Sequence, residues 1–307
     1  MQKNCDIMKE KGEISMSIDR LQEKIRKTKN PSLLDFDITR EQLPPHLLAE
    51  ERTFEKAYAR FCIELMEALR GVIPAVKFNF GGFALMGTEG LVTLSRVLDS
   101  ARRLGYYVIL EIPDALSAQR AKSNAQLLFS PECPWYYDGV LLTSYIGSDG
   151  IKPYAAQLEE TGKSLFVVVR TGNRSAMELQ DLLTGGRNVF DAKADIANRF
   201  KNAQATKSGY DRIGLVGPGS SAAILRKLRE KYKNLFILVD GYDYPNANAK
   251  NCAEAVDKVG HGAIVCAGTS ITAAWQAAEN DGTDFLEDAK EAADRMKKNL
   301  ARYFTVL

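Results

Sequence analysis

Short apolar runs rich in β-forming residues alternate with longer segments of helical periodicity along most of the 307-residue chain. This alternation is typical of βαβ units and predicts a parallel sheet. The predicted strands are Ser32–Ile38, Ala75–Phe80, Tyr106–Ile112, Gly139–Tyr145, Ser164–Thr171, Arg212–Val216, Leu235–Val239 and Ala263–Ala267. Eight such units in series close most naturally into a (β/α)₈ barrel, so the predicted fold class is α/β, a TIM barrel.

The apolar character of the runs supports this architecture. Val167–Val169 and Ala263–Ala267 are continuously apolar, as expected of strands that are covered on both faces. The alternative is an open doubly wound sheet. It is less favoured because no Gly-x-Gly-x-x-Gly motif follows the first strand, where a dinucleotide-binding fold would carry it.

Helices are predicted between the strands and at both ends of the chain. The predicted helices are Ile18–Arg26, Leu47–Leu69, Gly90–Leu104, Ser220–Tyr232, Ala253–Val259 and Phe285–Phe304. Residues 1–13 are polar and charged and are expected to form a disordered extension. Residues 14–307 are expected to form a single barrel domain.

Composition excludes several classes of protein. The net charge of +2, from 41 Lys+Arg against 39 Asp+Glu, is too small to indicate a nucleic-acid or membrane partner. The five cysteines show no metal-ligand spacing, so no zinc site or disulfide framework is predicted, and a reducing cytoplasm is the expected location. With only two histidines, a His-rich metal site or a Ser-His-Asp triad is not expected.

Polar side chains gather where the predicted strands end, which is where (β/α)₈ enzymes carry their working residues. The candidates include Asp35, Asp37, Lys77, Asn79, Glu111, Asp114, Thr143, Ser144, Arg170, Asn173, Asp240, Tyr242, Asp243, Thr269 and Ser270. For most of them a solvated loop or a rim ion pair is the simpler interpretation. Lys77 differs, because a lysine inside the apolar strand AVKFNF must reach the mouth of the barrel or pair with a carboxylate such as Asp37 or Glu111.

Several segments, in order, resemble the longer bacterial orotidine 5′-phosphate decarboxylases over about residues 17–274. The segments are SIDRLQEKIRKTKNPSLLDFDI, PAVKFNF followed by GTEGL, SYIGSDGIKPY and VVVRTGNRSAMELQDL. The resemblance implies a cofactor-free lyase of pyrimidine (UMP) biosynthesis that binds a phosphorylated nucleotide and forms a homodimer. It also implies a charge array in which Asp37 and Lys77 match the aspartate of strand one and the lysine of strand two.

The third strand departs from the family pattern. The family places Asp-x-Lys-x-x-Asp there, and its lysine stabilises and protonates the carbanion left by CO₂. This chain reads Glu111-Ile112-Pro113-Asp114-Ala115-Leu116, so Pro113 stands at the lysine and Leu116 at the aspartate lent to the neighbouring subunit. Lys77, Asp37, Glu111 and Asp114 therefore remain as the candidate catalytic residues.

The nucleotide-binding segments implied by the resemblance are altered as well. The glycine-rich phosphate loop reads Asp240-Gly241-Tyr242-Asp243-Tyr244-Pro245, and the phosphate arginine is Thr269. Gly172 replaces the serine that contacts the pyrimidine. The residues retained as candidates for substrate binding are Thr171, Asn173, Gly217, Gly241, Tyr242, Gly268 and Thr269.

The segment Phe190–Ile196, FDAKADI, is a tempting replacement for the missing motif. Its spacing is Asp-x-Lys-x-Asp, and it lies in a predicted helical stretch. On a helix Asp191 and Asp195 share a face while Lys193 points away, so we expect a solvated helix face and not a charge array.

Three functional hypotheses follow. The first is a catalytically impaired or inactive paralogue of the decarboxylases. The second is an enzyme with rebuilt chemistry on a small phosphorylated molecule, with paired carboxylates that could hold Mg²⁺. The third is a genuine decarboxylase with an altered site. Convergence of Lys77 and the carboxylates in the mouth would favour an enzyme, whereas pairing on the rim would favour the first hypothesis.

Overall fold

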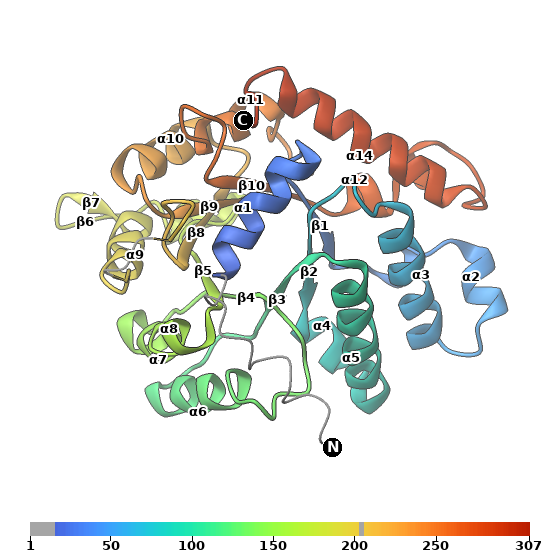
Figure 1. The fold of residues 1–307 in the computed structure, drawn as a ribbon, viewed down its shortest axis with the longest axis horizontal. Helices are drawn as coiled ribbons and strands as arrows, with labels where there is room; N and C mark the ends of the chain where they lie inside the picture. Colours follow the sequence, from blue (N-terminus) through green and yellow to red (C-terminus); the bar gives the residue numbers. More distant parts are fainter. Residues whose placement is uncertain (1–15, 203–205) are drawn as a thin grey trace.

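The computed structural model describes residues 16–202 and 206–307, and the extension predicted for residues 1–13 lies outside them. Eight parallel strands close into a barrel in the order β1-β10-β9-β8-β5-β4-β3-β2, with helices outside (Figure 1). The (β/α)₈ prediction is therefore confirmed, and each of the eight predicted strands overlaps a barrel strand.

The barrel strands are β1 Ser32–Phe36, β2 Ala75–Asn79, β3 Tyr107–Glu111, β4 Gly139–Leu142, β5 Ser164–Val168, β8 Ile213–Pro218, β9 Phe236–Asp240 and β10 Ala263–Ala267. The α-helices are α1 Ser17–Thr28, α2 Pro45–Glu50, α3 Phe54–Ala68, α4 Phe80–Leu85, α5 Gly87–Leu104, α6 Ala118–Leu128, α7 Lys152–Ala155, α8 Leu158–Thr161, α9 Val189–Asn198, α10 Ala222–Lys231, α11 Ala249–Cys252, α12 Thr269–Thr272, α13 Ala274–Ala277 and α14 Phe285–Ala301. Short 3₁₀ helices are η2 Arg40–Gln42, η3 Gly147–Gly150, η4 Arg174–Glu178 and η5 Ala253–Ala255.

The alternation of side chains along each strand divides the core into two layers. The outer layer lies between strands and helices and includes Leu34, Val76, Val108, Val140 and Leu215. The inner layer fills the barrel and is made by the intervening residues, Leu33, Ala75, Tyr107, Ile109, Leu141, Phe166, Phe236, Leu238 and Ile264. The barrel is thus a packed core, and open space for a ligand is confined to its ends.

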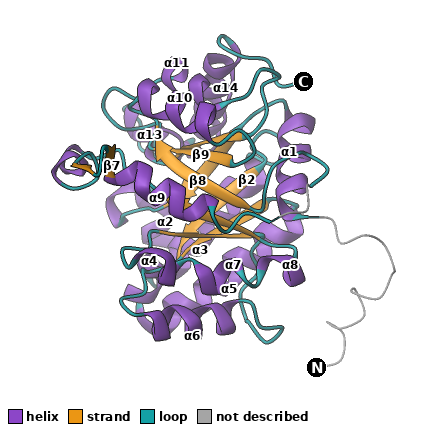
Figure 2. Ribbon diagram, turned by 90° about the vertical axis from the view of Figure 1, so that its left-hand side faces the viewer, coloured by secondary structure: helices purple, strands orange, loops and turns teal. Residues whose placement is uncertain are grey.

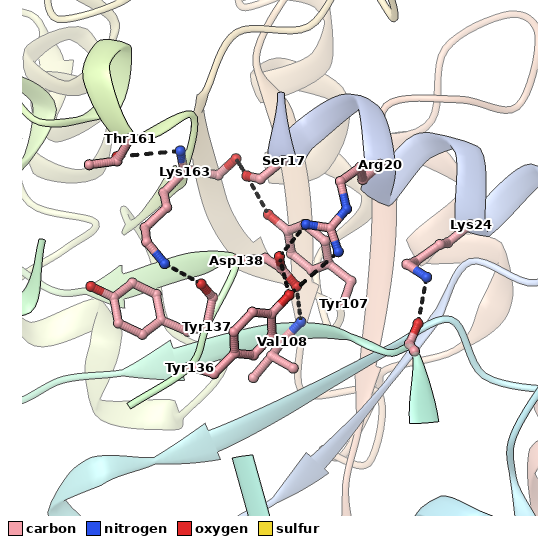
Figure 3. A network of polar contacts seen from close by, with 12 residues as sticks. Ser17, Arg20, Lys24, Tyr107, Val108, Tyr136, Tyr137, Asp138, Thr161 and Lys163 are labelled. Carbon is pink, nitrogen blue, oxygen red and sulfur yellow. Dashed lines mark hydrogen bonds and ion pairs between the residues drawn. The ribbon is translucent and has the colours of Figure 1, made fainter. Parts of the chain in front are cut away.

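Helix α1 closes the end of the barrel at which the strands begin. Its apolar face, Ile18, Leu21 and Ile25, belongs to the inner layer, and α1 lies across the ring of strands in Figure 1. At its first residue, Ser17 Oγ lies 2.6 Å from Ser164 Oγ and 3.3 Å from Tyr107 Oη (Figure 3). The other end of the barrel, at the carboxyl ends of the strands, is therefore the mouth.

A buried carboxylate anchors α1 to the strands. Asp138 accepts hydrogen bonds from Arg20 Nη1 at 2.7 Å, from Tyr136 Oη at 3.0 Å and from the backbone nitrogen of Val108 at 2.9 Å (Figure 3). Beside it, Lys163 Nζ donates to the carbonyl of Tyr137 at 2.5 Å. These bonds satisfy the charge of Asp138, which is almost fully buried.

Two local predictions need correction, and one element was not predicted. The helix predicted over Leu47–Leu69 is interrupted after Glu50, because Thr53 caps α3 by accepting from the backbone nitrogen of Lys56. The helix predicted over Ala253–Val259 is wrong, since only Ala253–Ala255 is helical there and Val256 is extended. A hairpin not predicted, β6 Leu183–Thr184 with β7 Arg187–Asn188, projects from the barrel (Figure 2).

Within the described residues, no helix is long and apolar enough to cross a membrane.

Candidate functional site

Five polar side chains meet in the barrel interior at the mouth, and the period of two along each strand explains why. Leu33, Ala75, Ile109, Leu238 and Ile264 face inward. The residues two positions further along the same strands therefore face inward as well, one layer closer to the mouth. They are Asp35, Lys77, Glu111, Asp240 and Cys266, and we call this group the mouth cluster.

Lys77 is the centre of the mouth cluster. Its Nζ lies 2.5 Å from Glu111 Oε2 and 3.0 Å from Asp35 Oδ2. Its side chain is only 7% exposed, so the ammonium group is held between the two carboxylates away from solvent. Convergence in the mouth, and not pairing on the rim, is therefore the arrangement that the chain adopts.

Asp240 and Cys266 complete the group. They come from β9 and β10, which lie on the side of β1 opposite to β2 and Lys77. One ligand atom from each of Asp35, Asp240 and Cys266 lies within 4.8 Å of the others, and Cys266 Sγ lies 3.9 Å from Asp35 Oδ2. The second oxygen of Asp35, Oδ1, is shielded from solvent and has no hydrogen-bond partner. The mouth cluster thus holds three carboxyl groups and a thiol against one ammonium group.

Burial perturbs the protonation of the acidic groups in the mouth cluster. Burial raises the pKa of Asp35 to about 7, although the ammonium group of Lys77 acts in the opposite direction. Burial also raises the pKa of Asp240, with Lys77 again opposing it. Burial disfavours the charge of Lys77, but Asp35 and Glu111 outweigh it and the pKa of Lys77 is raised. Near neutral pH the site therefore keeps a charged lysine, and the carboxyl group of Asp35 is close to the midpoint of its titration.

The cluster does not suit Mg²⁺. This ion prefers oxygen ligands in octahedral geometry, whereas the close group of Asp35, Asp240 and Cys266 includes a thiol. Burial holds the pKa of Cys266 well above that of a free thiol, which disfavours the thiolate that binds softer metals. The ammonium group of Lys77 already provides the positive charge between Asp35 and Glu111.

Two side chains of the loop after β9 contact the ends of neighbouring strands at the rim of the mouth. Asp243 Oδ2 accepts a hydrogen bond of 2.6 Å from the backbone nitrogen of Gly268, just after β10. Tyr244 packs its ring against Gly172 and Gly241, so close that a Cβ atom at either glycine would lie 2.2 Å from Tyr244 Cδ2. Both contacts involve residues that differ from the family pattern implied by the resemblance.

The structure places four of the predicted site residues away from the mouth cluster. Asp37 is exposed beyond the end of β1. The place beside Lys77 that was predicted for Asp37 is taken by Asp35. Asp114 accepts from the backbone nitrogens of Ser144 and Tyr145 at 2.9 and 2.7 Å and so ties two loops together. The remaining two face the outer layer of the barrel, Gly217 toward α10 and Tyr242 toward the packing beneath α14.

The other predicted residues lie on the loops around the mouth. Thr171 Oγ1 donates to Asn173 Oδ1 at 2.5 Å, and the Thr171 backbone nitrogen donates to Gln180. Gly241 has a positive φ of 72°, which suits glycine in the turn before Tyr244. Gly268 and Thr269 follow β10, and Thr269 Oγ1 accepts from Gln42 Nε2 at 3.1 Å. These groups are bonded within the chain, and their role in ligand binding remains a prediction.

The segment FDAKADI forms helix α9, as expected, but the expectation of a solvated face is wrong because Asp191 is buried. Asp191 pairs with Lys227, and Asp195 lies 2.7 Å from Lys231 Nζ and 2.8 Å from Arg187 Nη1. These ion pairs fall on the outside of the barrel and hold α9 against its neighbours, so the segment supplies no charge array to the mouth.

Comparison with known proteins agrees with this fold. No family model matches the chain. The orotidine 5′-phosphate decarboxylase of Clostridium acetobutylicum is 29% identical over 289 residues, which cover 94% of this chain and 99% of that protein. The enzyme of the same name from Rhodopirellula baltica is 27% identical, covering 90% of this chain and 96% of the other. The chain is therefore similar, over almost its whole length, to proteins named orotidine 5′-phosphate decarboxylase.

Solved structures of orotidine 5′-phosphate decarboxylases share the barrel. The Plasmodium berghei enzyme superposes with a TM-score of 0.73 at 14% identity, covering 92% of this chain and 98% of that one. The Leishmania donovani enzyme superposes with a TM-score of 0.70 at 20% identity, covering 93% and 99%. At these identities the likeness concerns the fold alone.

Asp35 and Asp240 were predicted only as strand-end candidates and not as catalytic or binding residues, and Cys266 and Tyr244 were not predicted at all. Asp35 could have been chosen over Asp37, because it has the same parity as the inward-facing Leu33 and still lies within the strand. Cys266 follows from the same argument in β10. Tyr244 could not have been found in this way, because its position depends on how the loop after β9 folds at the rim of the mouth.

Proposed function

We propose that this chain is an orotidine 5′-phosphate decarboxylase-like barrel that does not decarboxylate orotidylate. The observation that carries the proposal is the state of Lys77. Decarboxylation leaves a carbanion that needs a proton donor, and the family pattern supplies a second lysine where this chain has Pro113. Lys77 is clamped between Asp35 and Glu111, and these carboxylates raise its pKa, which makes it a poor acid.

The phosphate end of the mouth supports the same conclusion. A backbone nitrogen at the carboxyl end of a barrel strand is a ready donor for a phosphate group. Here the backbone nitrogen of Gly268 donates to Asp243 of the same chain. A phosphate dianion would have to displace this carboxylate and then lie close to it, and like charges at such a distance repel. The affinity for nucleotide monophosphates is therefore expected to be low.

A second candidate function is rebuilt acid–base chemistry in the same mouth. The observation that favours it is the convergence of Asp35 and Asp240 around a buried lysine, with a pKa of about 7 for Asp35. A carboxyl group that titrates near neutral pH can both donate and accept a proton under cellular conditions. The Mg²⁺-dependent version of this hypothesis gains no support from the ligand set.

We further propose that the protein acts as a homodimer in the cytoplasm. A groove of about 570 Å³ lies beside the mouth and is lined by Phe80, Ile112, Leu116, Leu127 and Trp135, among others. Leu116 and Leu127 are 85% and 70% exposed, which is unusual for leucines that line one groove. A second copy of the chain would bury this surface.

Titration calorimetry with uridine 5′-monophosphate tests the proposed loss of the nucleotide site. We expect no heat of binding at millimolar ligand for the wild type. In Asp243→Asn the repulsion is removed while the shape is kept, so any weak affinity should increase. Tight binding by the wild type that Lys77→Ala abolishes would contradict the proposal.

A further inference from the structure

A hollow of about 450 Å³ lies between α11 and the end of α14, beside the loop that follows β9. The two helices are neighbours in Figure 1, where the C-terminus of the chain lies next to α11. A hollow of this size is within the range of sites that bind small molecules. We call it the α11–α14 hollow, and it is lined by Tyr242, Ala247, Asn248, Ala249, Lys250, Asn299, Arg302 and Tyr303.

The α11–α14 hollow has one cation on each of two walls. Residues 247–250 form the first wall, which carries Lys250, and the end of α14 forms the second, which carries Arg302. The residues that line the hollow include no carboxylate. Within residues 16–202 and 206–307, neither of the two cations forms an ion pair. The hollow is therefore positively charged and is not neutralised by the chain.

The sequence explains why both cations stay unpaired. The acidic residue closest to Lys250 along the chain is Glu254, but both oxygens of Glu254 accept from Arg226, at 2.9 and 2.7 Å. The positions three and four residues before Arg302 hold an amide and Lys298, so α14 offers Arg302 no helical partner. The carbonyl end of a helix favours cations, which accounts for Lys298 in the last turn of α14 but not for Lys250 on another helix.

Two cations on different helices suit a ligand with two separate negative charges. A carboxylate carries one charge and so matches one cation, and the planar guanidinium group of Arg302 fits a carboxylate through two parallel hydrogen bonds. A phosphate monoester concentrates two charges on one group, which the single cation of either wall does not neutralise. The amides of Asn248 and Asn299 lie one on each wall and can donate to carboxylate oxygens.

We propose that the α11–α14 hollow is a binding site for small dicarboxylates, in which Lys250 holds one carboxylate and Arg302 the other. The inference goes beyond the proposed function and does not rest on it, because neither residue belongs to the mouth cluster. A bound dicarboxylate would connect the loop after β9, which carries Asp243 to the rim of the mouth, with the end of α14.

Isothermal titration calorimetry with succinate, glutarate and adipate tests the proposal, because these ligands differ only in the spacing of their two carboxylates. Pentanoate has the chain length of glutarate but a single carboxylate, so it is the matched control ligand. The titrations are made at pH 7.5 and low ionic strength, since salt screens exposed charges. We expect at least one dicarboxylate to bind with a Kd below about 1 mM, and at least about tenfold more tightly than pentanoate.

Two substitutions test which residues hold the ligand. Lys250→Ala and Arg302→Ala should each weaken binding of the tightest dicarboxylate by about tenfold or more, because each removes one charge-assisted contact. Lys122→Ala changes the net charge by the same amount at an exposed position of α6 and should leave the affinity unchanged. Unchanged circular dichroism and melting of the variants exclude unfolding as the cause of weaker binding.

Three results would overturn the inference. The first is neither heat of binding nor a shift in melting temperature with any of the three dicarboxylates at about 10 mM, far above the expected Kd. The second is equal affinity for glutarate, adipate, succinate and pentanoate, which would show that the two cations do not act together. The third is an unchanged affinity in both Lys250→Ala and Arg302→Ala, which would place the ligand elsewhere on the protein.

Discussion

Lys77 Nζ lies 3.0 Å from Asp35 Oδ2, and the two residues are direct partners in the parallel pairing of β1 and β2. The backbone register therefore places the two residues side by side and favours the ion pair. Glu111 lies on the other side of Lys77, so the three residues form the charged centre of the mouth.

The raised pKa of Asp35 predicts that stability falls as pH rises. An unfolded aspartate titrates near 4, whereas burial raises the pKa of Asp35 in the folded protein to about 7. Between these values the folded state binds the extra proton, so the free energy of unfolding decreases with pH, by roughly 2–4 kcal/mol over the window. Asp35→Asn should flatten this dependence, as measured by urea unfolding from pH 4.5 to 7.5. An equally steep dependence in the variant would assign the effect to another group.

Replacing Lys77 by methionine should destabilise the protein at high pH more than at low pH. At pH 8 the variant leaves Asp35, Glu111 and Asp240 without their common counter-charge, and removing one partner of a buried pair costs about 3–5 kcal/mol. At pH 5 the protonated carboxyl group of Asp35 should reduce the loss. Lys290→Met, at an exposed pair with Glu287, is the matched control and should have little effect. A loss that is the same at both pH values would mean that Lys77 acts by packing alone.

Gly172 and Tyr244 should be coupled in a double-mutant cycle. Gly172→Ser places a side chain into the ring of Tyr244 and should destabilise the protein by about 1–3 kcal/mol. In the Tyr244→Ala background the same substitution should cost almost nothing, because the ring is gone. The coupling free energy is measured by denaturant unfolding of the four proteins. Additive losses would show that the ring leaves position 172 free in solution.

Asp138→Asn should weaken the attachment of α1 to the barrel. The substitution keeps the shape but removes the charge that accepts from Arg20, Tyr136 and the backbone nitrogen of Val108. We expect a loss of about 2–4 kcal/mol in the free energy of unfolding. Glu23→Gln, at the exposed pair with Lys27 on the same helix, should change it very little. Similar losses in the two variants would count against an anchoring role for Asp138.

The proposed dimer predicts that a charge in the groove produces monomers. Leu116→Asp should shift the mass measured by light scattering from that of two chains to that of one, because the carboxylate would be buried without a partner. Leu183→Asp is the control, since Leu183 is similarly exposed but lies on the hairpin of β6 and β7. A monomeric wild type would remove the proposed dimer altogether.

Sequence patterns were sufficient to predict the barrel because each strand combines an apolar run with inward-facing residues at every second position. The same parity places Asp35, Lys77, Glu111, Asp240 and Cys266 in the mouth. The choice of Asp37 over Asp35 failed because the strand ends at Phe36, after which parity no longer determines direction.

Loop-dependent features could not be predicted in this way. The ring of Tyr244 over Gly172 and the carboxylate of Asp243 at Gly268 join residues about 70 and 25 positions apart through irregular backbone. The turn at Gly241 that makes both contacts is visible only in three dimensions.

The proposed loss of decarboxylation can be tested by measuring the release of CO₂ from orotidine 5′-monophosphate by the purified protein, with Lys77→Ala as the control for host enzyme. We expect no turnover above that of the Lys77→Ala variant. Turnover by the wild type that Lys77→Ala abolishes would contradict the proposal, and would mean that the clamped lysine protonates the carbanion after all.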